Sequence, residues 1–219
     1  MTPFVNVLWA SGVQMLGTSS GGYDTDTTSH DVTLPTGTEV GDVNVVVFRI
    51  GNDTVSSSPQ VAFTIPTGWT VVASHAGLTR VIARKRESGD PTSITIGTDA
   101  GRRSAFTVHR WGGAHGDVEA SSFATAPGSS TVTPAWGSAE NGYMAAISGR
   151  WTSQTFVEPT GYGSQVHAMS DGGGSSDAVQ CHVAVAHRIL ESSSEQPGDW
   201  TITGTASQEY TVVLAVRPA

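Results

Sequence analysis

The stretch PTGWT at residues 66–70 lies between two β-like runs and returns, altered, as PTGYG at residues 159–163. Proline cannot donate to a sheet ladder and glycine tolerates a positive φ, so Pro-Thr-Gly predicts a turn that ends one strand and starts the next. The aromatic residue that follows, Trp69 or Tyr162, is then expected to close one end of the core. The alternative for both aromatic residues is a stacking platform for a ligand.

The two phrases belong to a longer repeat, in which five features recur in the same order with offsets that drift as loop insertions would make them drift. The matched segments are 32–42 with 132–142, VNVVVFRI (43–50) with YMAAISGR (143–150), FTIPTGW (63–69) with FVEPTGY (156–162), 79–97 with 181–204, and 105–111 with 210–217. This recurrence predicts two similar halves, 31–113 and 131–219, after a leading strand and loop in residues 1–30.

Strand signals fill both halves. The run VNVVVFRI is nearly continuous and apolar, as expected for a strand covered on both faces, and no segment shows convincing helical periodicity. The Gly-rich stretches 18–29 and 170–178 are interpreted as long loops. We therefore predict an all-β chain with a single domain, 1–219, folded as an antiparallel β-sandwich of jelly-roll-like form.

Composition narrows the class of protein. The 219 residues are only 14% charged and include 26 glycines, which is typical of turn-rich β-structure. No apolar run approaches the roughly 18–20 residues of a membrane span, so no membrane partner is expected. The formal charge of −8 disfavours nucleic acid as a partner, because that affinity comes from Lys and Arg on phosphates.

The single cysteine and the N-terminal sequence both favour a protein that is assembled inside a bacterium. Cys181 is the single cysteine, so the chain can form no internal disulfide, and MTPFVNVLWASG at the N-terminus lacks the features of a secretory signal. A protein that is assembled in a bacterial cytoplasm and released by lysis is expected to have this combination. Proteins of phage particles are one such class.

Motifs for catalysis are weak. GTSSG (17–21) matches the nucleophile elbow in letters alone, because Ser19 is flanked by polar, Gly-rich sequence instead of a strand and a helix. The seven histidines show no zinc spacing, and Glu158 has no partner carboxylate for glycoside cleavage. We therefore predict no enzyme, no cofactor and no metal site. Calcium stays open for the acidic stretches that contain Asp24, Asp26, Asp31, Asp171 and Asp177.

Recognition by surface side chains is the remaining class of function. Aromatic residues on loops stack on sugars and anchor interfaces, and the candidates for ligand binding are Trp136, Trp151 and Tyr162. Seven of the 11 basic residues fall between positions 80 and 110. Strand alternation would place Arg80, Arg84 and Arg86 on one solvent-facing side, as a docking stripe for carboxylates on a capsid or an anionic glycan. The alternative is ordinary surface ion pairs, with Glu87, Asp90 or Asp99 as partners.

The order of these motifs carries a resemblance over residues 32–219. The residues that match are Gly41-Asp42, Pro66 to Thr70, Arg80 to Asp90, Arg110-Trp111-Gly112 and Val216 to Ala219. Their order resembles a loose family of bacteriophage virion proteins, which are tail-fibre, head-fibre or capsid-decoration components built on jelly-roll-like sandwiches.

The resemblance implies a non-enzymatic structural protein of the virion, with other virion proteins as partners and a homo-oligomer such as a trimer left open. A head decoration or spike is favoured over a tail appendage, because the chain has no obvious coiled-coil segment. The leading alternative is a carbohydrate- or receptor-binding module that meets a host surface glycan. A polysaccharide-cleaving enzyme is the third alternative.

Overall fold

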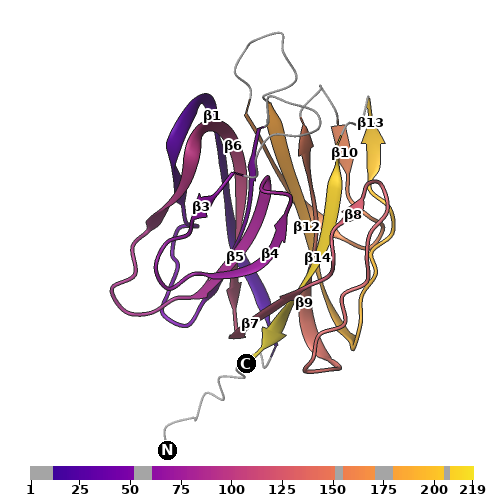
Figure 1. Cartoon of the computed structure of the whole chain (residues 1–219). Coiled ribbons are helices and arrows are strands. Elements are labelled where there is room, and N and C mark those ends of the chain that lie inside the picture. The colour runs from indigo at the N-terminus through magenta and orange to yellow at the C-terminus, as the bar shows by residue number, and fades with distance from the viewer. Residues whose placement is uncertain (1–11, 52–60, 151–154, 171–179, 205–207) are drawn as a thin grey trace, which may run out of the picture.

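The computed structural model in Figure 1 describes residues 12–51, 61–150, 155–170, 180–204 and 208–219. Within these residues the chain is all-β, with two large antiparallel sheets packed face to face, which confirms the predicted sandwich. No helix in the described residues is long and apolar enough to cross a membrane.

Each large sheet has five strands in one path and a short sixth strand beside it. The first sheet runs in the spatial order β1 (Gln14–Thr33), β6 (Ser93–Gly112), β2 (Val43–Ile50), β5 (Thr79–Lys85) and β4 (Thr70–His75), with β3 (Phe63–Thr64) beside β6. The second runs β7 (Ala114–Ala120), β14 (Tyr210–Pro218), β9 (Ala139–Arg150), β12 (Cys181–Ser192) and β11 (Gly163–Met169), with β8 (Ala124–Thr125) beside β14. A separate pair joins β10 (Thr155–Val157) to β13 (Thr201–Thr203).

The five strands of each path have the same spatial order relative to the chain: first, fifth, second, fourth, third. Each sheet is also built from one continuous part of the chain, and β7 and β8 join the second sheet although they precede residue 131. The jelly-roll detail is not confirmed, because a jelly roll would distribute successive strands between the two sheets. How closely the two halves superpose stays a prediction.

The two sheets share one core between them. In β2 the side chains of Val43, Val45 and Val47 face the second sheet, where they belong to the same buried cluster as Met144 and Val183. This alternation follows from the two-residue period of a strand. The central core therefore needs both halves of the chain.

Each sheet also has a buried outer face. Val46 and Phe48 of β2 point away from the second sheet into a cluster whose described members all come from the first half. Tyr143 and Ile147 of β9 belong to the corresponding cluster of the second half. Because both faces of β2 are covered, all eight of its residues are buried, which confirms the interpretation of VNVVVFRI.

The interpretation of residues 18–29 as a loop is wrong. They lie within β1, which pairs with β6 from Gln14 opposite Gly112 to Thr33 opposite Ser93, with irregularities near Tyr23 and Thr27. Backbone hydrogen bonds to β6 hold this polar, Gly-rich segment as a strand without an apolar face of its own. Glycine also has a steric role, because a Cβ at Gly22 would lie 2.5 Å from the carbonyl oxygen of Met169 in the other sheet. The second predicted loop lies largely outside the described residues.

Candidate binding site beside Trp69

Residues 66–69 and 159–162 form two turns of the same geometry. In each, the amide of the aromatic residue donates to the proline carbonyl, at 3.1 Å and 3.0 Å respectively. Gly68 and Gly161 both have φ +84°, and a positive φ at the third position is the type II turn that favours glycine. The repeated phrase is therefore a turn, as predicted, and the two copies differ in what surrounds their aromatic residue.

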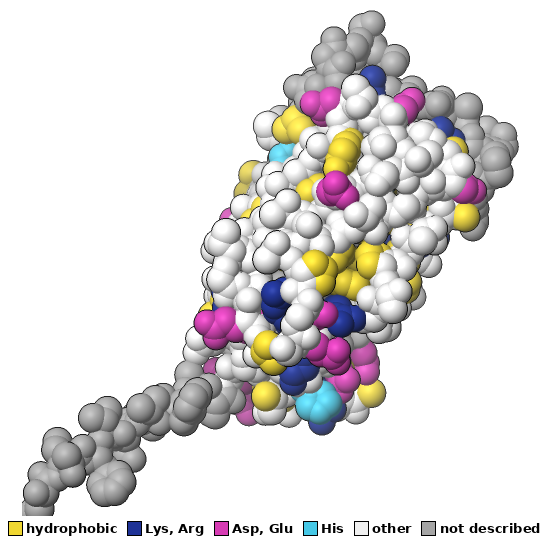
Figure 2. Space-filling view, turned by 90° about the vertical axis from the view of Figure 1, so that its left-hand side faces the viewer, with side chains coloured by type: hydrophobic (Ala, Val, Ile, Leu, Met, Phe, Trp, Pro, Cys, Tyr) yellow, Lys and Arg dark blue, Asp and Glu magenta, His cyan; other side chains and the backbone are white. Residues whose placement is uncertain are grey.

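A shallow hollow lies beside Trp69 on the outer face of the first sheet. Its cavity volume is about 70 Å³, and Trp69 is half-buried against the outer cluster of that sheet. The apolar part of the lining comes from Leu34, Pro66, Pro91 and Ile94. Figure 2 views the molecule from this side, where hydrophobic side chains gather beside basic and acidic ones on a surface that is otherwise mostly uncharged.

Arg84 and Asp90 form one rim of the hollow. The Nε and Nη2 atoms of Arg84 donate to the two carboxylate oxygens of Asp90, at 2.8 Å and 2.6 Å, and Nη1 donates to the carbonyl of Thr67 in the turn. This bidentate pair lowers the pKa of Asp90 and raises the pKa of Arg84. The pair therefore ties the segment after β5 to the Pro66–Trp69 turn.

Asn44 is a buried polar residue in the lining of the hollow, and packing does not account for it. The residue is 2% exposed, and its Oδ1 has no hydrogen-bond partner among the described residues. Leaving an amide oxygen buried and unpaired costs about 1–3 kcal/mol. Its neighbours on the same face of β2, Val46 and Phe48, are apolar, so packing alone does not explain an amide at this position.

The corresponding place in the second sheet is filled by a larger side chain. Asn44 lies opposite Arg84 in the pairing of β2 with β5, and Tyr143 lies opposite Arg188 in the pairing of β9 with β12. Tyr143 is fully buried, and its hydroxyl donates to the carbonyl of Ser192 at 2.9 Å. Burial raises the pKa of the Tyr143 phenol.

Tyr162, the aromatic residue of the second turn, is also buried. The hydroxyl of Tyr162 donates to Oε1 of Glu195 at 3.1 Å, and the Arg188 guanidinium lies 4.9 Å from the centre of the Tyr162 ring. Arg188 also pairs with Glu195, and burial raises the pKa of Tyr162. In the second half, the buried and hydrogen-bonded side chains of Tyr143 and Tyr162 therefore occupy the region that corresponds to the hollow of the first half.

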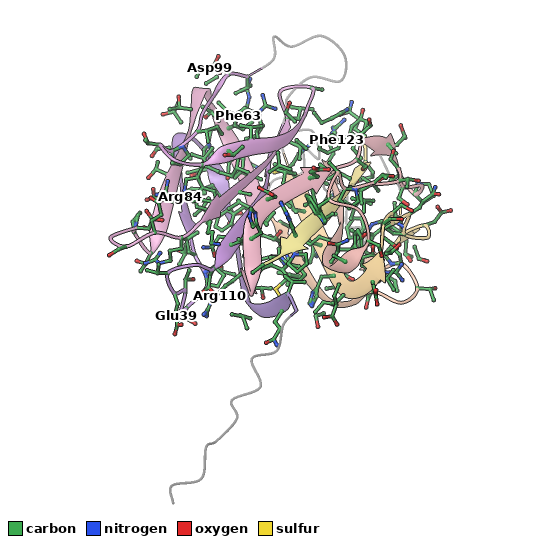
Figure 3. The ribbon with its side chains drawn as sticks, turned by 90° about the horizontal axis from the view of Figure 1, so that it is seen from below. Glu39, Phe63, Arg84, Asp99, Arg110 and Phe123 are labelled. Atoms are coloured by element: carbon green, nitrogen blue, oxygen red, sulfur yellow. The ribbon has the colours of Figure 1, made fainter. Side chains whose placement is uncertain are left out.

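The arginines of the predicted stripe lie on the outer side of the first sheet, and Figure 3 shows Arg84 on the side away from the second sheet. Each has a contact within the chain. Arg80 lies over the ring of Phe63 at 4.3 Å, and Arg86 donates to the carbonyls of Asp90 and Pro91. Arg84 thus forms the ion pair that the alternative interpretation named, and a docking role for the three arginines stays a prediction.

The other aromatic candidates do not gather at this hollow. Trp136 is half-buried against the outer cluster of the second half, and its Nε1 donates to Oδ1 of Asn141 at 2.7 Å. Tyr162 lies 8% exposed in the same cluster. Trp151 lies outside the described residues. A ligand-binding role for these three residues stays a prediction.

Three of the seven histidines are fully buried, which places their imidazoles in the core. His30 contacts the hydroxyls of Ser104 and Thr98, and Nε2 of His182 lies 2.6 Å from Oε2 of Glu209. In the described part of the chain, no three His, Cys, Asp or Glu side chains form a group that could hold a metal ion. Asp171 and Asp177 are not among the described residues.

His109 makes stability depend on pH. It is fully buried, neither ring nitrogen has a hydrogen-bond partner in the described structure, and desolvation followed by repulsion from His187 lowers its pKa to about 3. Below pH 6.5 the unfolded chain binds a proton that the folded chain excludes. The free energy of unfolding should therefore fall by about 1.4 kcal/mol per pH unit between pH 6.5 and about 3.

Denaturant unfolding at several pH values measures this effect. We expect His109→Leu to remove that part of the acid sensitivity, whereas His115→Gln, at a half-exposed side chain, should leave it unchanged. An equal acid dependence in His109→Leu and the parent chain would contradict the assignment.

A scan of the chain against protein-family models, a search of curated proteins and a search of solved structures find no match. No residue role is therefore carried over from a relative, and the site is defined by its own geometry.

Proposed function

We propose that this chain is a non-enzymatic structural protein displayed on the surface of a bacteriophage particle, as a head decoration or spike or as a tail appendage. The observation that carries the proposal is the contrast between polar side chains that are fully buried in the core and an exposed edge strand that is rich in small polar residues. His30, His109 and His182 are fully buried, whereas β1 presents Ser, Thr and Gly residues, together with three exposed aspartates, along an outer edge of the first sheet.

Two further features support display. Both outer faces of the sandwich are covered by the chain's own residues, which favours a rigid body. Short Ser and Thr side chains also lose less rotamer entropy than Lys or Glu side chains when they contact a partner, and Gly loses none. The motif order from Gly41-Asp42 to the C-terminal Val216 to Ala219 resembles that of phage structural proteins, and this resemblance favours the particle as the place of display.

A recognition module for a carbohydrate or a receptor is the second candidate function. The hollow beside Trp69 favours it, because a half-buried aromatic ring and a buried amide oxygen without a hydrogen-bond partner both line the hollow.

Attachment of the purified chain to phage particles assembled without it tests the first proposal. We expect the chain to sediment with the particles and to saturate at a fixed number of copies per particle. A chain that stays in the supernatant at every concentration, or that releases reducing ends from host polysaccharide, would contradict a non-enzymatic display role.

The same assay measures the docking role predicted for Arg80, Arg84 and Arg86. If they form the docking face, attachment should weaken as ionic strength rises, and the double variant Arg84→Glu, Arg86→Glu should lose it. Arg217→Glu is the matched control, because Arg217 is a partly exposed arginine of β14 that pairs with Asp117 of β7 within the second sheet. Attachment that responds neither to salt nor to the double variant would leave these arginines with their contacts inside the chain alone.

A further inference from the structure

We propose that the hollow beside Trp69 binds one ring of a neutral, hydroxyl-rich sugar. The inference rests on the second candidate function, recognition, and does not depend on attachment to a particle. Three features of the hollow specify the ligand: an unpaired acceptor, an aromatic and apolar lining, and charges that cancel.

The unpaired acceptor is Oδ1 of Asn44. A buried acceptor that lacks a donor favours a ligand that brings one, because the hydrogen bond then offsets a desolvation cost already present in the folded chain. Sugar hydroxyl groups are donors of suitable size. An apolar ligand would leave Asn44 unpaired, so the site discriminates against it.

The lining provides the surface for a sugar ring. Trp69 follows a rigid type II turn, and Pro66, Leu34, Pro91 and Ile94 complete an apolar wall around it. A pyranose ring has apolar C–H faces and a polar edge, and aromatic rings in binding sites supply an apolar body for such faces. A ring stacked on Trp69 could turn a hydroxyl toward Asn44.

The charges at the rim favour a neutral ligand over an anion. Asp90 accepts both bonds from Arg84, and Glu87 lies 3.4 Å from the same guanidinium. The two arginines at the hollow, Arg84 and Arg86, are thus matched in number by two nearby carboxylates. A sugar acid would meet the Asp90 carboxylate at the rim and find no guanidinium without a partner.

The second half shows that this fold does not require the hollow. Tyr143 occupies the position of Asn44, and its side chain is buried and hydrogen-bonded. A tyrosine at this position fills the space beside the strand, and it leaves no amide oxygen without a hydrogen-bond partner. The small amide at position 44 is therefore a specific feature of the first half.

A glycan array tests the proposal with the full chain. The probes are neutral oligosaccharides of glucose, galactose, mannose and N-acetylglucosamine, with sialylated and uronic-acid glycans as the charged arm. We expect binding to neutral glycans that does not change with ionic strength. The strongest neutral glycan on the array then serves for titration calorimetry of the variants.

Four variants locate the site. Asn44→Tyr should fill the hollow as Tyr143 does and abolish binding, and Asn44→Val should weaken it about tenfold by removing the acceptor. Trp69→Leu should also abolish binding, whereas Tyr162→Phe in the second turn should stay within about twofold of the parent. Thermal unfolding checks each variant, and Asn44→Val with Trp69→Leu decide the result if Asn44→Tyr does not fold.

Three results would overturn the proposal. They are the absence of binding to every neutral glycan, salt-sensitive binding to acidic glycans alone, and equal affinity in the parent and the Asn44 variants. Failure here is distinguishable from failure of the display role, because attachment to particles is measured without sugar. Particles that still bind the Asn44→Tyr chain would show that display survives when the hollow is filled.

Discussion

Trp111→Ala is expected to lower the free energy of unfolding by about 3–5 kcal/mol, the range for truncating a buried aromatic side chain. Trp111 is fully buried in the core that the two sheets share. Its ring lies directly against the backbone of Gly142 in the second sheet, where a Cβ would lie 2.5 Å from Cζ3 of Trp111. Neighbours held this closely cannot collapse to fill the space that the indole leaves.

Chemical denaturation of the variant measures the effect, with Trp136→Ala as the control. Trp136 is a half-buried tryptophan in an outer cluster, so its truncation should cost less. If Trp111→Ala unfolded within about 0.5 kcal/mol of the parent chain, the packing of the two sheets on this ring would be wrong.

A fragment of residues 12–113 is expected to have no cooperative unfolding transition. It contains the whole first sheet and its outer cluster, but it exposes Val43, Val45, Val47 and Val81, which the second sheet covers in the full chain. Loss of that burial removes the dominant favourable contribution to folding. Circular dichroism and thermal scans of the fragment, alone and mixed with residues 114–219, are the measurement.

We expect structure to return in the mixture, because the complementary fragment supplies the missing face. A soluble, monomeric fragment 12–113 that melts cooperatively alone would mean that each half has a sufficient core of its own. The outer cluster around Phe48 would then stabilise the first half more than the shared core does.

Much of the fold could be predicted from local sequence patterns. Unbroken apolar character identified β2 as a strand buried on both faces, and the Pro-Thr-Gly phrase identified both turns. The polar part of β1 could not be recognised in this way. Its strand conformation depends on hydrogen bonds to β6, about 80 residues away in sequence at the Gly22–Ala105 pair, and on Gly22 fitting beneath Met169.

The site was only partly predictable. The sequence drew attention to Trp69 and Arg84 and named Asp90 among the possible ion-pair partners, but which of these partners Arg84 contacts depends on how the segment after β5 folds back. Asn44 gave one local signal, an amide inside an apolar strand. The structure shows that Asn44 is the small residue at a position that the larger Tyr143 occupies in the second sheet. The repeat aligned by sequence, at an offset of 100, does not pair these two residues.

Labelling of intact, purified phage particles with an antibody against this chain, viewed by electron microscopy, tests display most directly. The proposal predicts label at a defined position on the outside of the head or tail, and loss of that label from particles assembled without the chain. A chain that is absent from purified particles and stays in the soluble lysate would contradict it.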